Sequence, residues 1–214
     1  MNPRFPAGRY DDSGMTLVEV IVAIAILAIV SSASVGLIID SGASVTTIQR
    51  RQVALTIANG ALESVSAQPA AAAATTNGLS YLFTGRSQSA VMTAWTPMAA
   101  QPGVSHTYPS WDANAASASS VLIPFTTTSS PNGTTYTAST LLGTCYQPLS
   151  GGDCSTLPGY ASPPTTTPAG YTPLVRAIVV VSWEAGPDCA TSGCSYVAST
   201  LLDPNADLQW VTHG

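Results

Sequence analysis

Four cysteines carry the most reactive side chains in the sequence, and all of them lie in its C-terminal half. Their spacing groups them as Cys145 with Cys154 and Cys189 with Cys194. Four cysteines allow three pairings, and the short separations favour these two. Each disulfide would contribute about 2–3 kcal/mol by the loop-entropy estimate. Four thiolates could instead bind zinc, but the gaps within each pair are wider than those usual in zinc sites. We therefore expect two local disulfides and no metal.

Two histidines are the remaining candidates for acid–base chemistry. His106 or His213 could form a hydrolase triad with Asp112 and one of the many serines. No G-x-S-x-G string is present, however, so we expect both histidines on the surface. The sequence predicts no catalytic residue and no cofactor.

Two further binding patterns have a simpler structural explanation. Asp203, Asn205 and Asp207 alternate as in a calcium loop, but no glycine or terminal glutamate completes it, and a turn around Pro204 is expected. The tryptophans could line a glycan-binding face, although large aromatic residues more often pack in a core. They are Trp95, Trp111, Trp183 and Trp210.

The chain is poor in charge. Charged residues make up 8% of its 214 residues, against about 25% in soluble proteins. The net charge is −5, and all six basic residues are arginines. A nucleic-acid-binding protein needs clustered basic residues, so no nucleic-acid partner is expected. A surface made mainly of Ser, Thr, Asn, Gln and Gly suits an exported protein.

An uncharged apolar run occupies residues 20–39. As a helix it would span about 30 Å, the thickness of the hydrocarbon core of a bilayer. A cleaved secretory signal is the alternative, because Ser31-Ser32-Ala33 resembles a small-residue cleavage site. Asp11 and Asp12 stand where such a signal usually has its basic residues. The run therefore predicts a retained membrane helix.

The helical pattern continues beyond the apolar run. Apolar residues recur at helical spacings as far as Val65, and Pro69 ends the pattern. One helix over about residues 15–67 would be about 80 Å long. Gly36 and Gly60 are its expected weak points.

The rest of the chain has the short apolar runs and turn residues of an antiparallel sheet. Residues 79–118 are predicted as mostly loop with minor strand, and residues 158–173 as a Pro- and Thr-rich loop. A turn at Pro131-Asn132-Gly133 should join two strands. The expected strands are residues 121–128, 134–142, 174–183 and 196–202. The fold class is therefore α+β, with a long N-terminal helix packed on a C-terminal antiparallel sheet.

The string Gly14-Met15-Thr16-Leu17-Val18-Glu19 stands directly before the apolar run. A carboxylate entering a membrane helix is costly and usually functional, although Glu19 could simply lie at the membrane interface. The string and the apolar helix after it resemble the class III signal of type IV pilins and type II secretion pseudopilins. The resemblance covers about residues 8–66, and residues 51–63 are similar to the amphipathic helical half of that family.

This resemblance implies a processing route. A prepilin peptidase would cut between Gly14 and Met15 and methylate the new amine of Met15. The parts would be a leader (1–14), a transmembrane and assembly helix (15–39), an amphipathic helical half (40–67) and an extracytoplasmic β-rich domain (68–214). The chain would be a single-pass protein of the cytoplasmic membrane that joins a surface filament. It departs from many members at Met15, where they have phenylalanine, and at Gly36, where they have proline.

The spacing of Met15 and Glu19 has a physical rationale. Cleavage creates an α-ammonium on Met15, with an ordinary pKa of about 8, one helical turn from Glu19. In a filament the ammonium of one subunit could meet the carboxylate of a neighbour. Pairing two charges that are each costly in lipid would favour docking and set its register.

The sequence therefore predicts a non-enzymatic filament subunit, a minor pilin or pseudopilin, whose partners are the peptidase, other subunits and the membrane. A membrane-anchored or secreted binding protein that never polymerises is the alternative, and an exported hydrolase is a weaker one. The position of N-terminal cleavage distinguishes these possibilities.

Overall fold

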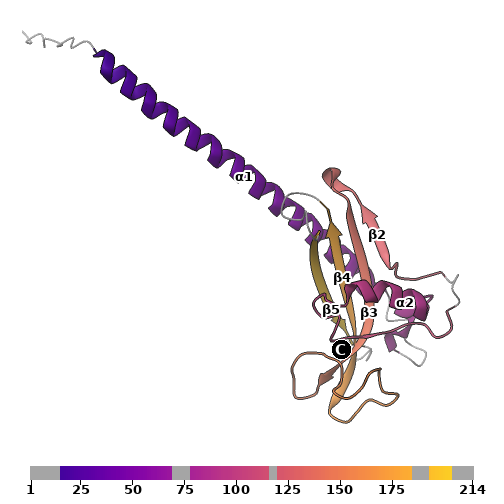
Figure 1. Cartoon of the computed structure of the whole chain (residues 1–214). Helices are drawn as coiled ribbons and strands as arrows, with labels where there is room; N and C mark the ends of the chain where they lie inside the picture. Colours follow the sequence, from indigo (N-terminus) through magenta and orange to yellow (C-terminus); the bar gives the residue numbers. More distant parts are fainter. Residues whose placement is uncertain (1–14, 69–77, 116–119, 185–192, 204–214) are drawn as a thin grey trace, which may run out of the picture. The chain divides into compact units, whose positions relative to one another are not determined.

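A computed structural model describes residues 15–68, 78–115, 120–184 and 193–203. The chain divides into two compact units, one ending at Ile48 and one beginning at Gln49. Helix α1 (Leu17–Ser66) contributes to both units. Its bounds confirm the long N-terminal helix expected from the sequence, and Figure 1 shows it in indigo and purple.

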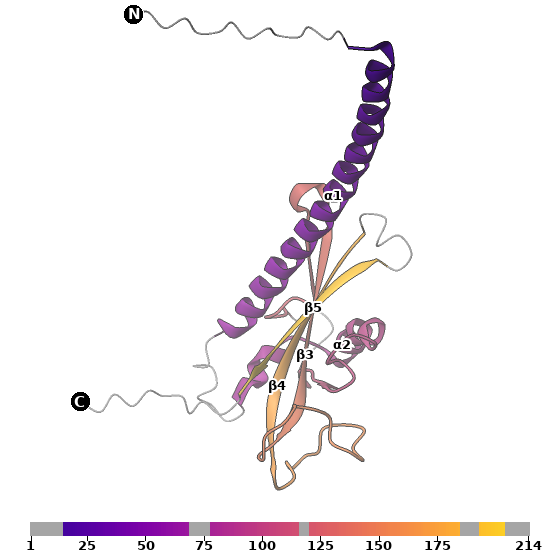
Figure 2. The same ribbon diagram turned by 90° about the vertical axis from the view of Figure 1, so that its left-hand side faces the viewer.

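An antiparallel sheet forms the centre of the second unit (Figures 1 and 2). Its strand order is β1-β3-β4-β5, and β2 also pairs with β3. The strands are β1 (Tyr108–Pro109), β2 (Thr126–Ser129), β3 (Tyr136–Pro148), β4 (Tyr171–Trp183) and β5 (Cys194–Leu202). The predicted α+β class with an antiparallel sheet is thus confirmed.

The two longest strands, β3 and β4, pair along their whole length, from Tyr136 opposite Trp183 to Pro148 opposite Tyr171. Because side chains alternate along a strand, each strand supplies residues to both faces of the sheet. Val179 and Val181 pack with Ala54 and Ala58 of α1, whereas Ile178 and Val180 pack on the opposite face.

The opposite face is covered by α2 (Gln88–Trp95), which buries Val91 and Trp95. The sheet therefore lies between α2 and the last part of α1 (Figure 1). Both faces of β4 are buried, which explains why its sequence is almost continuously apolar instead of alternating.

The prediction of mostly loop with minor strand for residues 79–118 is incomplete, because strand β1 is present but helical structure was not expected. This segment contains the 3-10 turns η2 (Gly78–Phe83) and η3 (Thr96–Met98) as well as α2. The N-cap of α2 is Ser87, whose hydroxyl accepts a hydrogen bond from the Ala90 N–H. A helix of 8 residues with two buried positions is too short to show a clear helical period in the sequence.

The strand bounds also differ from those expected. β2 starts later than the predicted strand at 121–128, β3 continues to Pro148, and β4 begins at Tyr171, inside the predicted loop at 158–173. The turn at Pro131–Gly133 is present, with Asn132 in the left-handed region at φ 53°. Full-length pairing with a neighbour extends β3 and β4 into polar sequence that has little strand preference of its own.

Candidate functional site

The first turn of α1 is closed by a reciprocal pair of side chains. The backbone N–H of Thr16 donates to Glu19 Oε2 at 2.9 Å, and the Thr16 hydroxyl donates to the same oxygen at 3.1 Å. The Glu19 N–H donates in turn to Thr16 Oγ1 at 3.4 Å. This is a capping box, which satisfies N–H groups that an α-helix leaves unpaired at its start.

The capping box leaves part of the Glu19 carboxylate available. Among the described residues, Oε2 accepts both hydrogen bonds and Oε1 accepts none. The Thr16 N–H belongs to the Met15–Thr16 peptide, so a cut before Met15 would not remove it. The free oxygen can therefore receive a cation while the other holds the helix start.

The segment after the capping box is apolar and uncovered. Leu17–Ile38 has a mean hydropathy of 2.6, and none of it is buried within the chain. Its length and composition are sufficient to cross a membrane. The hydroxyls of Ser32 and Ser34 donate to the carbonyls of Ile29 and Val30, each at 2.8 Å. These polar groups are thus satisfied inside the helix, as lipid requires.

The other residues predicted for processing and assembly are placed as follows. Met15 is 80% exposed immediately before the helix, and Gly14 lies outside the described residues. Gly36 stays within continuous helix, with open space where a side chain would be. Its role as a weak point in a filament remains a prediction.

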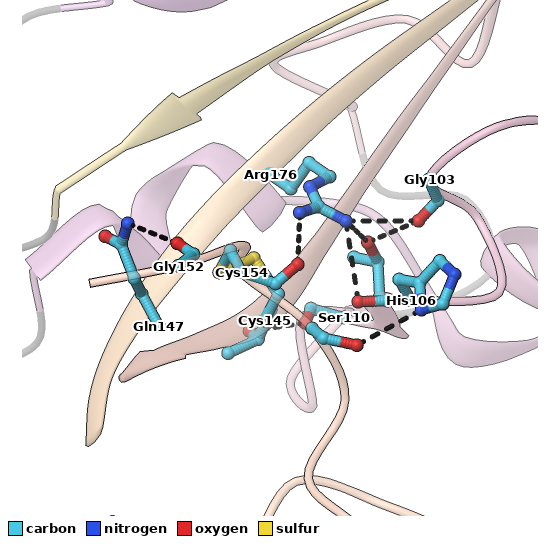
Figure 3. The surroundings of a disulfide bond; sticks show 11 residues. Gly103, His106, Ser110, Cys145, Gln147, Gly152, Cys154 and Arg176 are labelled. Carbon is cyan, nitrogen blue, oxygen red and sulfur yellow. Dashed lines mark hydrogen bonds between the residues drawn. A yellow bond between two sulfur atoms is a disulfide. The ribbon is translucent and has the colours of Figure 1, made fainter. Parts of the chain in front are cut away.

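The β-rich unit contains a Cys145–Cys154 disulfide, with the Cα atoms 5.4 Å apart (Figure 3). It joins the end of β3 to the connection that leads to β4, and it confirms the expectation of a disulfide in this part of the chain. Two of the four thiolates that a zinc site would need are thereby bonded to each other. Cys189 lies outside the described residues, so its pairing with Cys194 remains a prediction.

Arg176 of β4 ties the disulfide to a neighbouring turn (Figure 3). One guanidinium nitrogen donates to the Cys154 carbonyl, and the other donates to Thr107 Oγ1 at 3.0 Å and to the Gly103 carbonyl at 3.3 Å. Arg176 is 9% exposed, and burial lowers its pKa, an effect that nearby Asp153 opposes. The guanidinium therefore acts as a buried cross-link between two loops.

We expect Arg176→Met to lower the free energy of unfolding by about 3 kcal/mol, because buried carbonyls lose a charged donor. Chemical denaturation of the detergent-solubilised full chain measures this change. Arg51→Met is the matched control, since Arg51 is exposed on α1; a surface change of this kind alters stability by less than about 0.5 kcal/mol. Equal stability of the two variants would contradict the cross-link.

Within the described ranges, the other candidates named from the sequence do not assemble into a catalytic site. His106 Nδ1 lies 3.1 Å from Ser155 Oγ, whereas Asp112 accepts hydrogen bonds from the backbone of Gly85 and Asn114. No hydrogen bond joins His106 to Asp112 among the described residues.

Trp95 and Trp183 lie in the core, and Trp111 is half-buried against it. The described residues contain no group of three potential metal ligands. Four other candidates lie outside the described residues: Asn205, Asp207, Trp210 and His213.

Sequence reasoning missed a second buried arginine, Arg86, which is 1% exposed. Its two terminal nitrogens donate to the carbonyls of Ile123 and Thr140, each at 2.8 Å, and its guanidinium carbon lies 3.9 Å from the centre of the Phe125 ring. Burial lowers the pKa of Arg86 to about 10, so it stays charged at neutral pH. Nothing in the local sequence signals these distant partners.

Comparison with known proteins identifies the N-terminal segment. The family described as the prokaryotic N-terminal methylation motif matches residues 9–35. The chain has no significant match among curated proteins or solved structures. The matched residues include the capping box and most of the apolar segment, so the resemblance to a prepilin-type signal is confirmed.

Proposed function

We propose that this prepilin-type precursor matures into a structural subunit of a type IV pilus or a type II secretion-like filament. It is cleaved after Gly14, methylated at Met15 and assembled through its N-terminal helix. The observation that carries the proposal is the methylation motif at residues 9–35, which ends in an uncovered apolar helix. A peptidase, a membrane and neighbouring subunits are the partners that such a segment requires.

Assembly would use the chemistry at the start of α1. Cleavage turns the Met15 nitrogen into an ammonium, and Glu19 has an oxygen that the capping box does not use. In a filament this carboxylate would receive the ammonium of a neighbouring subunit. The pairing is favourable because each of the two charges would be costly in lipid without the other.

The β-rich unit would lie outside the cytoplasm. A surface of low charge and a buried disulfide both suit that compartment, because disulfides persist where the environment is oxidising. The chain beyond Gln52 lacks the features of a polyanion receptor: Arg86 and Arg176 are its sole basic residues besides histidine, and both side chains are buried. We favour a minor pilin or pseudopilin, a reading supported by the Val-rich strand β4 that ends at Trp183.

Mass spectrometry of the mature protein tests the processing. We expect the chain to begin at Met15 and to carry a methyl group on its α-amine. The sequence has no lysine, so a methylated amine can be assigned to the N-terminus without ambiguity. A start at Ser34 would indicate an ordinary secretory signal, and an uncut chain would indicate an anchored monomer. Either result would contradict the proposal.

A further inference from the structure

A proline-flanked run of threonines lies in the connection between β3 and β4. The threonine loop is residues 163–168, and its sequence is Pro-Pro-Thr-Thr-Thr-Pro. Thr165, Thr166 and Thr167 are all exposed. No hydrogen bond to their hydroxyls occurs among the described residues. Three neighbouring hydroxyl groups are thus presented to the solvent without a structural partner.

The chain on either side of the threonine loop is held in place. On one side the Tyr108 hydroxyl accepts from the Leu157 N–H and donates to the Tyr160 carbonyl, each at 2.9 Å. On the other side the Leu149 N–H donates to the Gly170 carbonyl at 2.8 Å, directly before β4. The loop therefore projects from fixed ends, beyond the end of the sheet where β3 stops and β4 starts (Figure 2).

The prolines determine how the loop can be recognised. Proline has no N–H, fixes φ at about −65° and favours extended backbone at the residue before it. The threonine loop is accordingly irregular and not paired with a strand. An enzyme that modifies a hydroxyl can bind such a backbone without first breaking regular structure. Sequences rich in Ser, Thr and Pro are typical of O-glycosylated segments.

A second threonine run in the same chain provides an internal comparison. Thr126, Thr127 and Thr128 are also exposed, but they form strand β2. Their backbone pairs with β3, from Thr126 opposite Ser139 to Thr128 opposite Thr137. An enzyme would have to separate these strands before it could bind the segment. The threonine side chains are therefore exposed in both runs, but only the backbone of the threonine loop is free of strand pairing and can be bound by an enzyme.

The charge distribution of the chain beyond Pro69 is consistent with a neutral modification. The two arginines of this range, Arg86 and Arg176, are buried. The exposed charged side chains that the structure describes here are therefore acidic, as at Asp153, Glu184 and Asp203. A surface with few charges depends on neutral hydrogen-bonding groups for hydration. Sugar hydroxyls would add such groups without altering the net charge.

We propose that Thr165, Thr166 and Thr167 form an O-glycosylation site. A threonine Oγ1 attacks the anomeric carbon of a polyprenyl-phosphate-linked sugar, and a glycosidic C–O bond forms as the bond to phosphate breaks. The hydroxyl proton leaves to solvent or to a base of the transferase, and the polyprenyl phosphate is the leaving group. The choice of a lipid-linked donor rests on the proposed function, which places this domain outside the cytoplasm.

Two chymotryptic peptides of full-length protein purified from its native cells test the site. Cleavage after aromatic residues yields peptide 161–171, which contains the threonine loop, and peptide 126–136, which contains the β2 run. We expect peptide 161–171 to be heavier by whole monosaccharide units and peptide 126–136 to have its unmodified mass. Peptide 126–136 contains more hydroxyl residues, so modification governed by composition alone would favour it.

Matched triple variants complete the test. Replacing Thr165, Thr166 and Thr167 with alanine should remove the added mass from peptide 161–171, which still contains Ser162. The same replacement at Thr126, Thr127 and Thr128 should leave that mass unchanged. An unmodified peptide 161–171 in the wild-type protein, or added mass that persists in the first variant, would overturn the proposal. The N-terminus measured on the same sample reports separately on the proposed function.

Discussion

Gly14→Leu is expected to leave the precursor uncut and absent from filaments. The bond between Gly14 and Met15 must enter the active site of the peptidase, and a bulky side chain beside it displaces the reacting carbonyl. A displacement of about 1 Å can slow an enzymatic reaction about 100-fold. The uncut chain also has an amide nitrogen in place of the α-ammonium at Met15, so Glu19 lacks its proposed cation. Mass spectrometry of membranes and of sheared filaments measures both effects.

Gly14→Ala is the matched control for this variant. It changes the same position by one methyl group and should be cut at a rate that is close to normal or moderately reduced. Uncut Gly14→Leu protein should remain in membranes, since the apolar segment Leu17–Ile38 is unchanged. Normal cleavage of Gly14→Leu would place the processing site elsewhere and contradict the proposed route.

Glu19→Gln is expected to lower incorporation into filaments by at least about tenfold, because a desolvated ammonium loses its charged partner. The structure makes glutamine the informative substitution. Gln can occupy the third position of a capping box, so the hydrogen bonds with Thr16 can remain while the charge is lost. Glu19→Ala removes both the charge and the hydrogen bonds with Thr16, and it should reduce incorporation at least as much. The measured quantity is the ratio of this protein in sheared filaments to that in membranes.

Glu63→Gln is the control for the loss of a negative charge from α1. Glu63 is exposed and lies outside the apolar segment, so its substitution should leave the ratio unchanged. Cleavage should persist in all three variants, because the cut precedes Met15. Normal incorporation of both Glu19 variants would contradict the proposed salt bridge and favour the anchored, non-polymerising alternative.

Long patterns made the main elements predictable. The apolar run and the helical stripe after it extend over enough turns to define α1, and the Val-rich segment identified β4. The capping box could also have been found, because Thr16 and Glu19 have the T-x-x-E spacing that defines it. The short helix α2 could not, since its two buried residues, Val91 and Trp95, give too little periodicity.

The buried arginines show why other details could not be predicted. Arg86 bonds to carbonyls 37 and 54 residues further along the chain, and Arg176 to groups 22 and 69 residues before it. These acceptors are backbone or hydroxyl oxygens, which every segment possesses, so no residue type marks them. Topology alone brings them together, and an arginine inside an apolar strand gives no indication of which loop it will hold.

The burial of Arg86 and Arg176 has a consequence for proteolysis. Trypsin-like enzymes cut after arginine or lysine, and no other such residue lies between Gln52 and Gly214. Both side chains are engaged with carbonyls in the interior, so the folded chain beyond Gln52 presents neither arginine to the specificity pocket of such an enzyme. The nearest alternatives are Arg50 and Arg51, close to the boundary between the two units. Cleavage there would separate the membrane segment from the rest and leave Ala54 and Ala58 packed on the sheet.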